Sequence, residues 1–441
     1  MKGLFTPIFL SYLRFAAKLQ LKKIRPKIVG IAGSSGKSST SMLTTVVLRE
    51  KFKVKQTGGK NSETGIPLSI LDLDINSYGL FNWFTIVFKS LIAALTNFKK
   101  YDIFVAEMGI DSPYEPKNMS YLLKIIKPDI AVLTNISYEH SVYFEKEVKN
   151  DENKQKEVLD SIVWEEASLI KSLNENSYAV INLDDSNTAS FLKEVKAKIV
   201  SVSTKEKSAT YFIDKIKTSL YKFEVKFKFE NKTYVIKLNL PLPDFYAYSF
   251  LFSIAVSGIL EVETGEAIKI LEDKFSLPPG RLSILKGIKD SIIIDSSYNN
   301  SLEPAVGIME MVAKIAGGRR RIGILGDMRE QGSQSAMLHQ QLAEKMIENL
   351  DFAILIGPML STYAPPILQE KGFSFLAFKN FSEAKEHILE SIQTKDIIMV
   401  KGSQNELFLE RAVELLLANS IDVEKLCRRG AFWDKVRGKT P

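Results

Sequence analysis

A glycine-rich loop carries the most specific chemical signal in the sequence. The run Gly33-Ser34-Ser35-Gly36-Lys37-Ser38, continued by Ser39, follows an apolar segment at 27–32 and precedes a helix-compatible run over 37–51. Glycines in such a turn let backbone N–H groups face phosphate oxygens, and a helix N-terminus adds a favourable field. The lysine would reach the β- and γ-phosphates of a nucleotide, and the first serine after it would offer a hydroxyl to Mg²⁺. A flexible loop with a chance Gly-Lys-Ser is the alternative.

Two further residues with metal-binding chemistry follow predicted strands. Glu107 ends a short apolar strand at 103–106, where a hard oxygen ligand for Mg²⁺ would be needed. His140 comes shortly after Thr134-Asn135, at the end of another predicted strand at 130–133. The alternatives are a solvated loop carboxylate for Glu107 and a structural or surface role for His140.

The elements that would position these residues alternate between short apolar strands and helical segments. Strands are expected at 27–32, 103–106, 130–133 and 178–181, and this alternation predicts a parallel sheet. Between about 199 and 240 the hydrophobic period changes to two, which predicts antiparallel strands in a small appended sheet. A helix is expected over 246–260. A second α/β unit would contain strands at 291–295, 321–325, 352–356 and 396–400.

The run Leu277-Pro-Pro-Gly-Arg281 predicts the boundary between these units. We therefore expect an N-terminal amphipathic basic segment at 1–26, a central phosphate-loop domain at 27–279 and a C-terminal domain at 280–441. The fold class is α/β: a P-loop domain with a parallel sheet and a small appended antiparallel sheet, followed by a Rossmann-like α/β domain.

Composition narrows the class of protein without choosing its ligand. The chain has 441 residues, 45% of them hydrophobic, a formal charge of +7 and a pI near 9.0, which suits anionic ligands but also nucleic acid or an acidic membrane. The single cysteine, Cys427, fits a reducing compartment, so the cytoplasm is expected. Apolar stretches at 4–17 and 80–95 are too short or too interrupted to cross a bilayer. Each predicts a partly buried amphipathic helix, with attachment to a membrane surface, notably through 1–26, as the alternative.

Several motifs in order resemble the Mur ligase family, over about residues 27–415. The loop resembles the family's ATP loop, whose leading glycine is displaced as it is here, where Ile31 replaces the usual first glycine. The other similar segments are 61–69, 105–109, 128–136 with His140, Gly280-Arg-Leu282, 295–299, 326–330 with His339, and Lys401-Gly-Ser403. The last four resemble the branch that adds D-alanyl-D-alanine.

The resemblance implies an ATP- and Mg²⁺-dependent ligase that activates a carboxylate as an acyl phosphate and joins it to an amine, releasing ADP and phosphate. The expected substrates are a small-molecule or lipid-linked muropeptide and an amino-acid or dipeptide acceptor, in cell-wall synthesis. Catalytic roles would fall to Lys37, Glu107, His140 and Arg281. ATP contacts would come from 33–39, Asn135, Arg281, Asp295, Tyr298 and Asn299. Acceptor contacts would come from Asp327, His339, Lys401 and Ser403. For His339, a capping or hydrogen-bonding role is an equal alternative.

One position departs from the family in an informative way. Family members typically carry a lysine, converted by CO₂ to a carbamate that holds Mg²⁺, where this sequence has Glu166. We hypothesise that Glu166 supplies a permanent carboxylate, so that the metal ligands would be Ser38, Glu107, His140 and Glu166. The rival interpretation is that Glu165 and Glu166 form only a solvated helix face.

The resemblance also leaves alternatives open. Because the strand that leads into the phosphate loop already begins at residue 27, there is no room before it for the family's N-terminal uridine-nucleotide-binding domain. We therefore expect this domain to be missing. An amidating or polyglutamate-forming ligase on another substrate remains an alternative. A P-loop ATPase that binds nucleic acid is another alternative, although the basic density at 317–321 is a single cluster before a strand. A scaffold that retains the fold without catalysis is a third. We expect a monomer without a nucleic-acid partner.

Overall fold

The computed structural model describes residues 2–74, 80–138, 142–145, 154–329, 331–403 and 406–438. The predicted ligand His140 therefore lies outside the described residues. The chain forms two compact units. The first contains 1–215, 225–236 and 245–275, and the second contains 216–224, 237–244 and 276–441.

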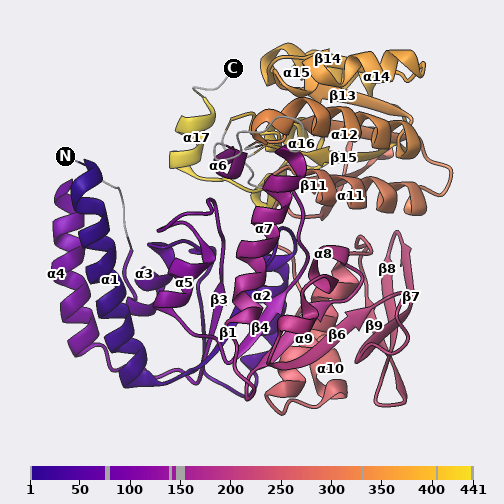
Figure 1. Ribbon diagram of the computed structural model, residues 1–441. Helices are drawn as coiled ribbons and strands as arrows, with labels where there is room; N and C mark the ends of the chain where they lie inside the picture. The colour runs from indigo at the N-terminus through magenta and orange to yellow at the C-terminus, as the bar shows by residue number, and fades with distance from the viewer. Residues whose placement is uncertain are drawn as a thin grey trace. The chain divides into compact units, whose positions relative to one another are not determined.

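A nine-stranded sheet in the order β2-β3-β1-β4-β5-β6-β7-β8-β9 contains the predicted parallel strands (Figure 1). Its strands are β1 Lys27–Ala32, β2 Val54–Gln56, β3 Ile103–Glu107, β4 Ile130–Leu133, β5 Tyr178–Asn182, β6 Lys198–Ser203, β7 Tyr211–Ser219, β8 Lys222–Phe229 and β9 Lys232–Leu238. The first seven strands of the sheet order, from β2 through β7, pair in parallel with their neighbours. Strands β1, β3 and β4 are almost entirely buried, as expected for a parallel sheet covered on both faces.

The strands predicted as a small appended antiparallel sheet continue this same sheet, and β6, which lies in the predicted antiparallel range, pairs in parallel with both β5 and β7. Two residues separate β7 from β8, and two separate β8 from β9. Glu230 and Asn231, between β8 and β9, have φ of 47° and 61°, as a two-residue hairpin turn with both central residues left-handed requires. The period-two pattern of β8, with Phe223, Val225 and Phe227 buried, places its apolar face against the core.

The helices of this part of the chain cover the sheet or pack at its side. They are α1 Lys2–Ile24, α2 Lys37–Leu48, α3 Gly65–Leu71, α4 Leu80–Thr96, α5 Met119–Ile125, α6 Val142–Glu145, α7 Lys154–Lys171, α8 Ser186–Ala189, α9 Tyr246–Ile259 and α10 Thr264–Lys274, with a 3₁₀ turn at Leu192–Glu194. Helices α2 and α9 pack on each other, and so do α5 and α7. This packing fixes the start of α2, which carries the end of the phosphate loop.

The two apolar stretches near the N-terminus are helices α1 and α4, which lie side by side (Figure 1). Leu13 and Ala16 of α1 share a buried cluster with Ile86 and Ala94 of α4. Lys23 Nζ donates to the carbonyl of Ala94 at 2.8 Å. The prediction of partly buried helices is confirmed. Among the residues the structure describes, no helix has the length and apolar character needed to span a membrane.

The second unit contains a six-stranded sheet in the order β10-β11-β15-β12-β13-β14. Its strands are β10 Ser283–Lys286, β11 Ile292–Ser296, β12 Arg321–Gly326, β13 Phe352–Ile356, β14 Phe375–Phe378 and β15 Ile397–Lys401. All pair in parallel except β10, which is antiparallel to β11. The helices are α11 Leu302–Ile315, α12 Ser335–Asn349, α13 Leu360–Tyr363, α14 Pro365–Glu370, α15 Phe381–Ser391, α16 Glu410–Leu416 and α17 Ala431–Arg437, with 3₁₀ turns at Ile288–Asp290, Gly332–Gln334 and Ser420–Lys425.

Candidate active site

The phosphate loop connects the buried strand β1 to helix α2 and depends on two glycines. Gly33 and Gly36 have φ of 123° and 81°, in the left-handed region that favours glycine. A Cβ atom on Gly33 would lie 2.2 Å from the Thr134 hydroxyl oxygen, so a side chain does not fit there. Gly36 is the residue just before the first turn of α2. The backbone conformation that a phosphate-binding loop needs is therefore present.

The residues that follow β4 hold this loop from the neighbouring strand. Asn135 accepts a hydrogen bond from the Ser35 N–H through its side chain at 2.9 Å, and from the Ser34 N–H through its carbonyl at 2.9 Å. The Thr134 hydroxyl donates to the Ser35 carbonyl at 2.6 Å. Because β1 and β4 are parallel neighbours, their carboxyl ends meet at one edge of the sheet. Asn135, predicted as an ATP contact, shapes the loop.

Lys37 lies folded over the loop. Its ammonium donates to the carbonyl of Gly33 and, at 2.8 Å, to the carbonyl of Ser34. Its positive charge is therefore held at the loop, next to the first turn of α2, where backbone N–H groups lack helical partners. The Lys37 ammonium therefore lies beside the loop that is expected to bind phosphates.

Ser38 and Glu107 form the expected hydroxyl and carboxylate pair. The Ser38 hydroxyl lies 3.0 Å and 3.1 Å from the two carboxylate oxygens of Glu107. The Asn61 amide donates to the same carboxylate at 3.4 Å, and Thr57 Oγ1 accepts from the Glu107 N–H at 3.1 Å. Glu107 is 6% exposed. The alternative of a solvated loop carboxylate is therefore wrong.

Helix α7 brings two consecutive buried glutamates to different partners. Glu166 Oε2 accepts from the Gly33 N–H at 3.0 Å, which places a carboxylate directly against the phosphate loop. Glu165 Oε2 accepts from the Met119 N–H at 2.9 Å, at the first turn of α5, and burial raises the pKa of Glu165. Both residues are no more than 5% exposed. The interpretation of Glu165 and Glu166 as a solvated helix face is wrong.

Part of this site lines a small cavity of about 200 Å³. Gly33, Lys37, Asn61, Gly109 and Glu166 contribute to its lining. Searched over the described part of the chain, no cluster of three or more His, Cys, Asp or Glu side chains forms a metal cage. Mg²⁺ is commonly held by one or two protein oxygens together with substrate phosphates and water, and the Ser38 hydroxyl and Glu107 carboxylate are oxygens of the right kind. The site thus combines a phosphate cradle, a fixed cation and hard oxygen donors.

In the second unit, the predicted nucleotide-contacting residues lie at the carboxyl end of β11. Asp295 is fully buried, accepts from the Ser297 N–H at 3.0 Å, and has a pKa raised by burial. The guanidinium carbons of Arg281 and Arg428 lie 4.8 Å and 4.7 Å from the centroid of the Tyr298 ring. Arg281 is exposed, so its guanidinium is accessible to an anion. Asn299 is exposed, and its carbonyl accepts from Lys401.

The predicted acceptor residues follow the adjacent strands β12 and β15. Asp327 accepts from the Leu360 N–H at 2.7 Å and the Met359 N–H at 3.2 Å, at the start of α13. His339 is fully buried, with Nε2 accepting from the Met328 N–H at 3.0 Å and Nδ1 2.6 Å from the Ser335 carbonyl. Burial lowers the pKa of His339. The hydrogen-bonding alternative for His339 is therefore observed. Lys401 and Ser403 are buried at the end of β15.

Some residues that build the sites had no predicted role. Asn61 and Thr134 lie within motifs whose similarity was noted, so their position in those motifs was a usable signal. Glu165 and Arg428 lie outside these motifs, so no such signal pointed to their contacts. The Arg428 guanidinium forms a buried ion pair with Glu410 at 3.0 Å and donates to the Tyr298 carbonyl. Residues this far apart in sequence give no local pattern that would connect them.

Comparison with known proteins agrees with this geometry. Residues 31–257, just over half of the chain, match the profile of the Mur ligase middle domain, and residues 280–404 match that of the Mur ligase, glutamate ligase domain. A UDP-N-acetylmuramoyl-tripeptide--D-alanyl-D-alanine ligase from Borreliella burgdorferi is 26% identical over 407 residues, covering 91% of this chain and 77% of the relative. The enzyme of the same name from Escherichia coli is 22% identical, and the match covers 90% of this chain and 78% of the relative.

Solved structures show the same fold. The MurF ligase from Thermotoga maritima in complex with ADP has a TM-score of 0.72 at 21% identity, covering 94% of this chain and 84% of that one. MurF from Acinetobacter baumannii has a TM-score of 0.73 at 19% identity, covering 92% and 79%. With a phosphate loop, a fixed lysine and buried carboxylates in the matched middle domain, the chain belongs to the Mur ligase family and is an ATP-dependent ligase.

Proposed function

We propose that this enzyme joins D-alanyl-D-alanine, or a closely similar amine, to the peptide carboxylate of a muramoyl peptide, through an acyl phosphate and with release of ADP and phosphate. The support from the comparisons is that relatives matching nine-tenths of the chain are named as ligases of D-alanyl-D-alanine and UDP-N-acetylmuramoyl-tripeptide. The observation that carries the proposal is the array of Lys37, Ser38, Glu107 and Glu166 at one loop.

Each of these groups has a part in phosphoryl transfer to a carboxylate. Such a reaction needs charge neutralisation more than covalent help. Lys37 would bind the β- and γ-phosphates of ATP, and the loop N–H groups would orient them. Ser38 and Glu107 would hold Mg²⁺, which would neutralise charge on the transferred group. His140, predicted as another ligand, lies outside the described residues and stays a prediction.

Glu166 is proposed to supply the fixed carboxylate that family members obtain from a carbamylated lysine. Two observations support this: the side chain is buried, and its Oε2 lies 3.0 Å from the backbone nitrogen of Gly33. A glutamate in this role needs no CO₂.

The second unit is proposed to contribute the binding site of the amine acceptor and some of the residues that bind the nucleotide. Strands β11, β15 and β12 are consecutive in its sheet, so Asp295, Lys401 and Asp327 all lie at or just beyond the carboxyl ends of adjacent parallel strands. Ligands of open α/β sheets bind at such an edge. Asp327 and His339 would act by holding the loop after β12, while Lys401 and Ser403 would be nearer the acceptor. Arg281 is proposed as a phosphate contact, because its guanidinium is both exposed and oriented by Tyr298.

The test is a direct assay of the purified chain with ATP, Mg²⁺, UDP-N-acetylmuramoyl-tripeptide and D-alanyl-D-alanine. We expect a product of the combined mass less one water, with one ADP and one phosphate per product. Parallel reactions with ammonia or glutamate in place of the dipeptide test the amidating and glutamate-adding alternatives. Formation of AMP and pyrophosphate would reject the acyl-phosphate route.

We further propose that the enzyme acts as a monomer in the cytoplasm. The single, buried cysteine, Cys427, supports the cytoplasmic part of this proposal, because it suits a reducing compartment. Contact of 1–26 with a membrane surface is a separate proposal, supported by the exposure of Ile8 and Phe15 on α1. Sedimentation of the protein with and without anionic vesicles tests both.

A further inference from the structure

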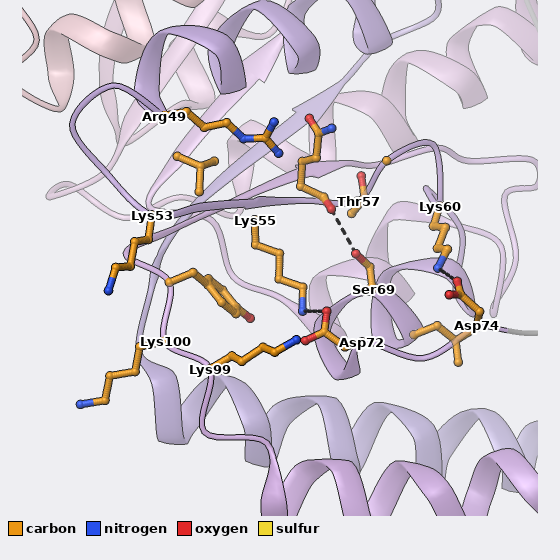
Figure 2. Close-up of a pocket in the computed structure, with 15 residues that line it drawn as sticks. Arg49, Lys53, Lys55, Thr57, Lys60, Ser69, Asp72, Asp74, Lys99 and Lys100 are labelled. Atoms are coloured by element: carbon orange, nitrogen blue, oxygen red, sulfur yellow. Dashed lines mark hydrogen bonds and ion pairs between the residues drawn. The ribbon is translucent and has the colours of Figure 1, made fainter.

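A second, larger cleft lies along the edge strand β2 (Figure 2). Its volume is about 900 Å³, which is within the range of sites for small molecules. Strand β2, the end of α2, part of α3 and the segment 99–101 line it. It lies wholly within the first unit. None of the residues proposed above to bind ATP or the acceptor lines it.

The cleft is strongly cationic. Its lining contains six basic side chains and two carboxylates: Arg49, Lys53, Lys55, Lys60, Lys99 and Lys100 against Asp72 and Asp74. Figure 2 shows Lys55 and Lys99 directed toward Asp72, and Lys60 directed toward Asp74. Two acids cannot compensate six bases, so a positive excess remains for a ligand. Across the described residues, Arg49, Lys53 and Lys100 form no ion pair.

A partly buried lysine and a buried tyrosine inside the cleft reflect this crowding of charge. Burial is the main cause that lowers the pKa of Lys55, and the like charges of Lys99 and Lys60 lower it further. The ion pair with Asp72, at 2.7 Å, opposes this shift. Tyr101, with Lys55 over its ring at 5.2 Å, is 7% exposed, and its hydroxyl has no hydrogen-bond partner among the described residues. An anion would relieve the repulsion between the lysines.

One end of the cleft adjoins the proposed metal site. Thr57, which lines the cleft, accepts from the backbone N–H of Glu107, and Lys60 precedes Asn61, whose amide donates to the Glu107 carboxylate. The opposite end is formed by Lys53 and Lys100, near the amino ends of β2 and β3. A ligand whose reacting carboxylate lay near Glu107 could therefore extend along β2 toward these lysines.

We infer that this cleft binds the diphosphate-bearing end of the carboxylate substrate. The inference rests on the proposed function, whose assay substrate, UDP-N-acetylmuramoyl-tripeptide, carries the muramoyl peptide on a diphosphate. The shared chemistry is a sugar diphosphate, whether its other end is a nucleoside or a lipid. A nucleic acid fits less well, because within the described lining the one aromatic side chain, Tyr101, is buried and cannot stack on bases.

The test measures binding, so that it does not depend on turnover. Calorimetric titrations would use UDP, geranyl diphosphate and inorganic pyrophosphate, with the phosphate loop saturated by Mg²⁺ and a non-hydrolysable ATP analogue. The cleft variant is Lys53→Glu/Lys100→Glu, both exposed residues. The matched control is Lys193→Glu/Lys196→Glu, which makes the same charge change at exposed residues outside the cleft. Lys53→Gln/Lys100→Gln serves if the reversal lowers the melting temperature.

We expect the cleft variant to weaken binding of all three probes by about tenfold, and the neutral variant by about threefold, since neutralisation removes two weak attractions while charge reversal also adds repulsion. The control should stay within about twofold of wild type. Tighter binding of UDP than of pyrophosphate identifies a nucleotide carrier, and tighter binding of geranyl diphosphate identifies a lipid carrier. Equal affinity of the wild type and the cleft variant would overturn the inference. Failure of the proposed function would appear elsewhere, as no ligation product in the assay above.

Discussion

The role of Glu166 can be separated from its contribution to the fold by two substitutions. Glu166→Gln keeps an oxygen that can accept from the Gly33 N–H but removes the negative charge. Glu166→Ala removes both and leaves the N–H of a buried loop without its acceptor. If Glu166 acts as the fixed carboxylate of the metal site, the two variants should share a defect in Mg²⁺ dependence. If it only holds the loop, the glutamine variant should behave like the wild type.

The expected sizes differ enough to be measured. Loss of a hydrogen bond to a charged, buried acceptor costs about 1.5–3 kcal/mol. For domains of roughly this size, 1 kcal/mol corresponds to about 2 °C in melting temperature, so Glu166→Ala should melt about 3–6 °C lower. Glu166→Gln should stay within about 2 °C. Removing a group that supports a metal site typically costs about 10–100-fold in metal affinity, which we expect of both variants.

The assay is the initial rate of ADP formation as a function of Mg²⁺ concentration, with scanning calorimetry on the same preparations. A third variant, Glu166→Lys, tests the family comparison, because its activity should depend on added bicarbonate. The reasoning is refuted if Glu166→Gln shows the Mg²⁺ dependence of the wild type, or if Glu166→Ala is fully active.

Three other predictions concern the phosphate loop and the buried groups of the second unit. Lys37→Ala should lower ATP turnover by at least about 100-fold without changing the melting temperature by more than a few degrees, because it removes a charge that is proposed to face the transferred phosphate. Arg428→Ala should lower the free energy of unfolding in urea by about 3–5 kcal/mol, since it leaves Glu410 buried without its partner, whereas Arg428→Met/Glu410→Leu should recover most of that loss. Burial raises the pKa of the Cys427 thiol to about 11 from 9.0. The folded chain therefore holds this proton to higher pH than the unfolded chain, so the linked stability is complete below about pH 9 and lost as pH rises toward 11. Urea titrations across this range should show a decline that is smaller in Cys427→Ser, and a thiol reagent at pH 8 should react only after unfolding.

Local patterns were enough to locate most strands and the phosphate loop. Strand β4 was predicted with its observed bounds because four apolar residues sit between polar ones, and β1 for the same reason. The loop needs only glycines at two turns and a helix after it, all within a dozen residues. Hairpin strands β7 to β9 were also predictable, since a period of two is a property of neighbouring residues. The bounds of α2 were less accurate, with the helix ending at Leu48 and not at 51.

The direction and partners of charged side chains were decided only by the tertiary structure. Glu165 and Glu166 are identical neighbours in sequence, yet α7 turns one toward α5 and the other toward the phosphate loop, because successive helical residues point about 100° apart. Their partners lie 46 and 133 residues away. The cationic cleft likewise joins lysines from two separate segments, 53–60 and 99–100, which become one feature only when β2 pairs with β3. The sequence by itself determined which chemical groups are available and which short elements present them. The packing of α7 and β2 determined which groups meet, because contacts between distant segments depend on the whole fold and leave no periodic signal.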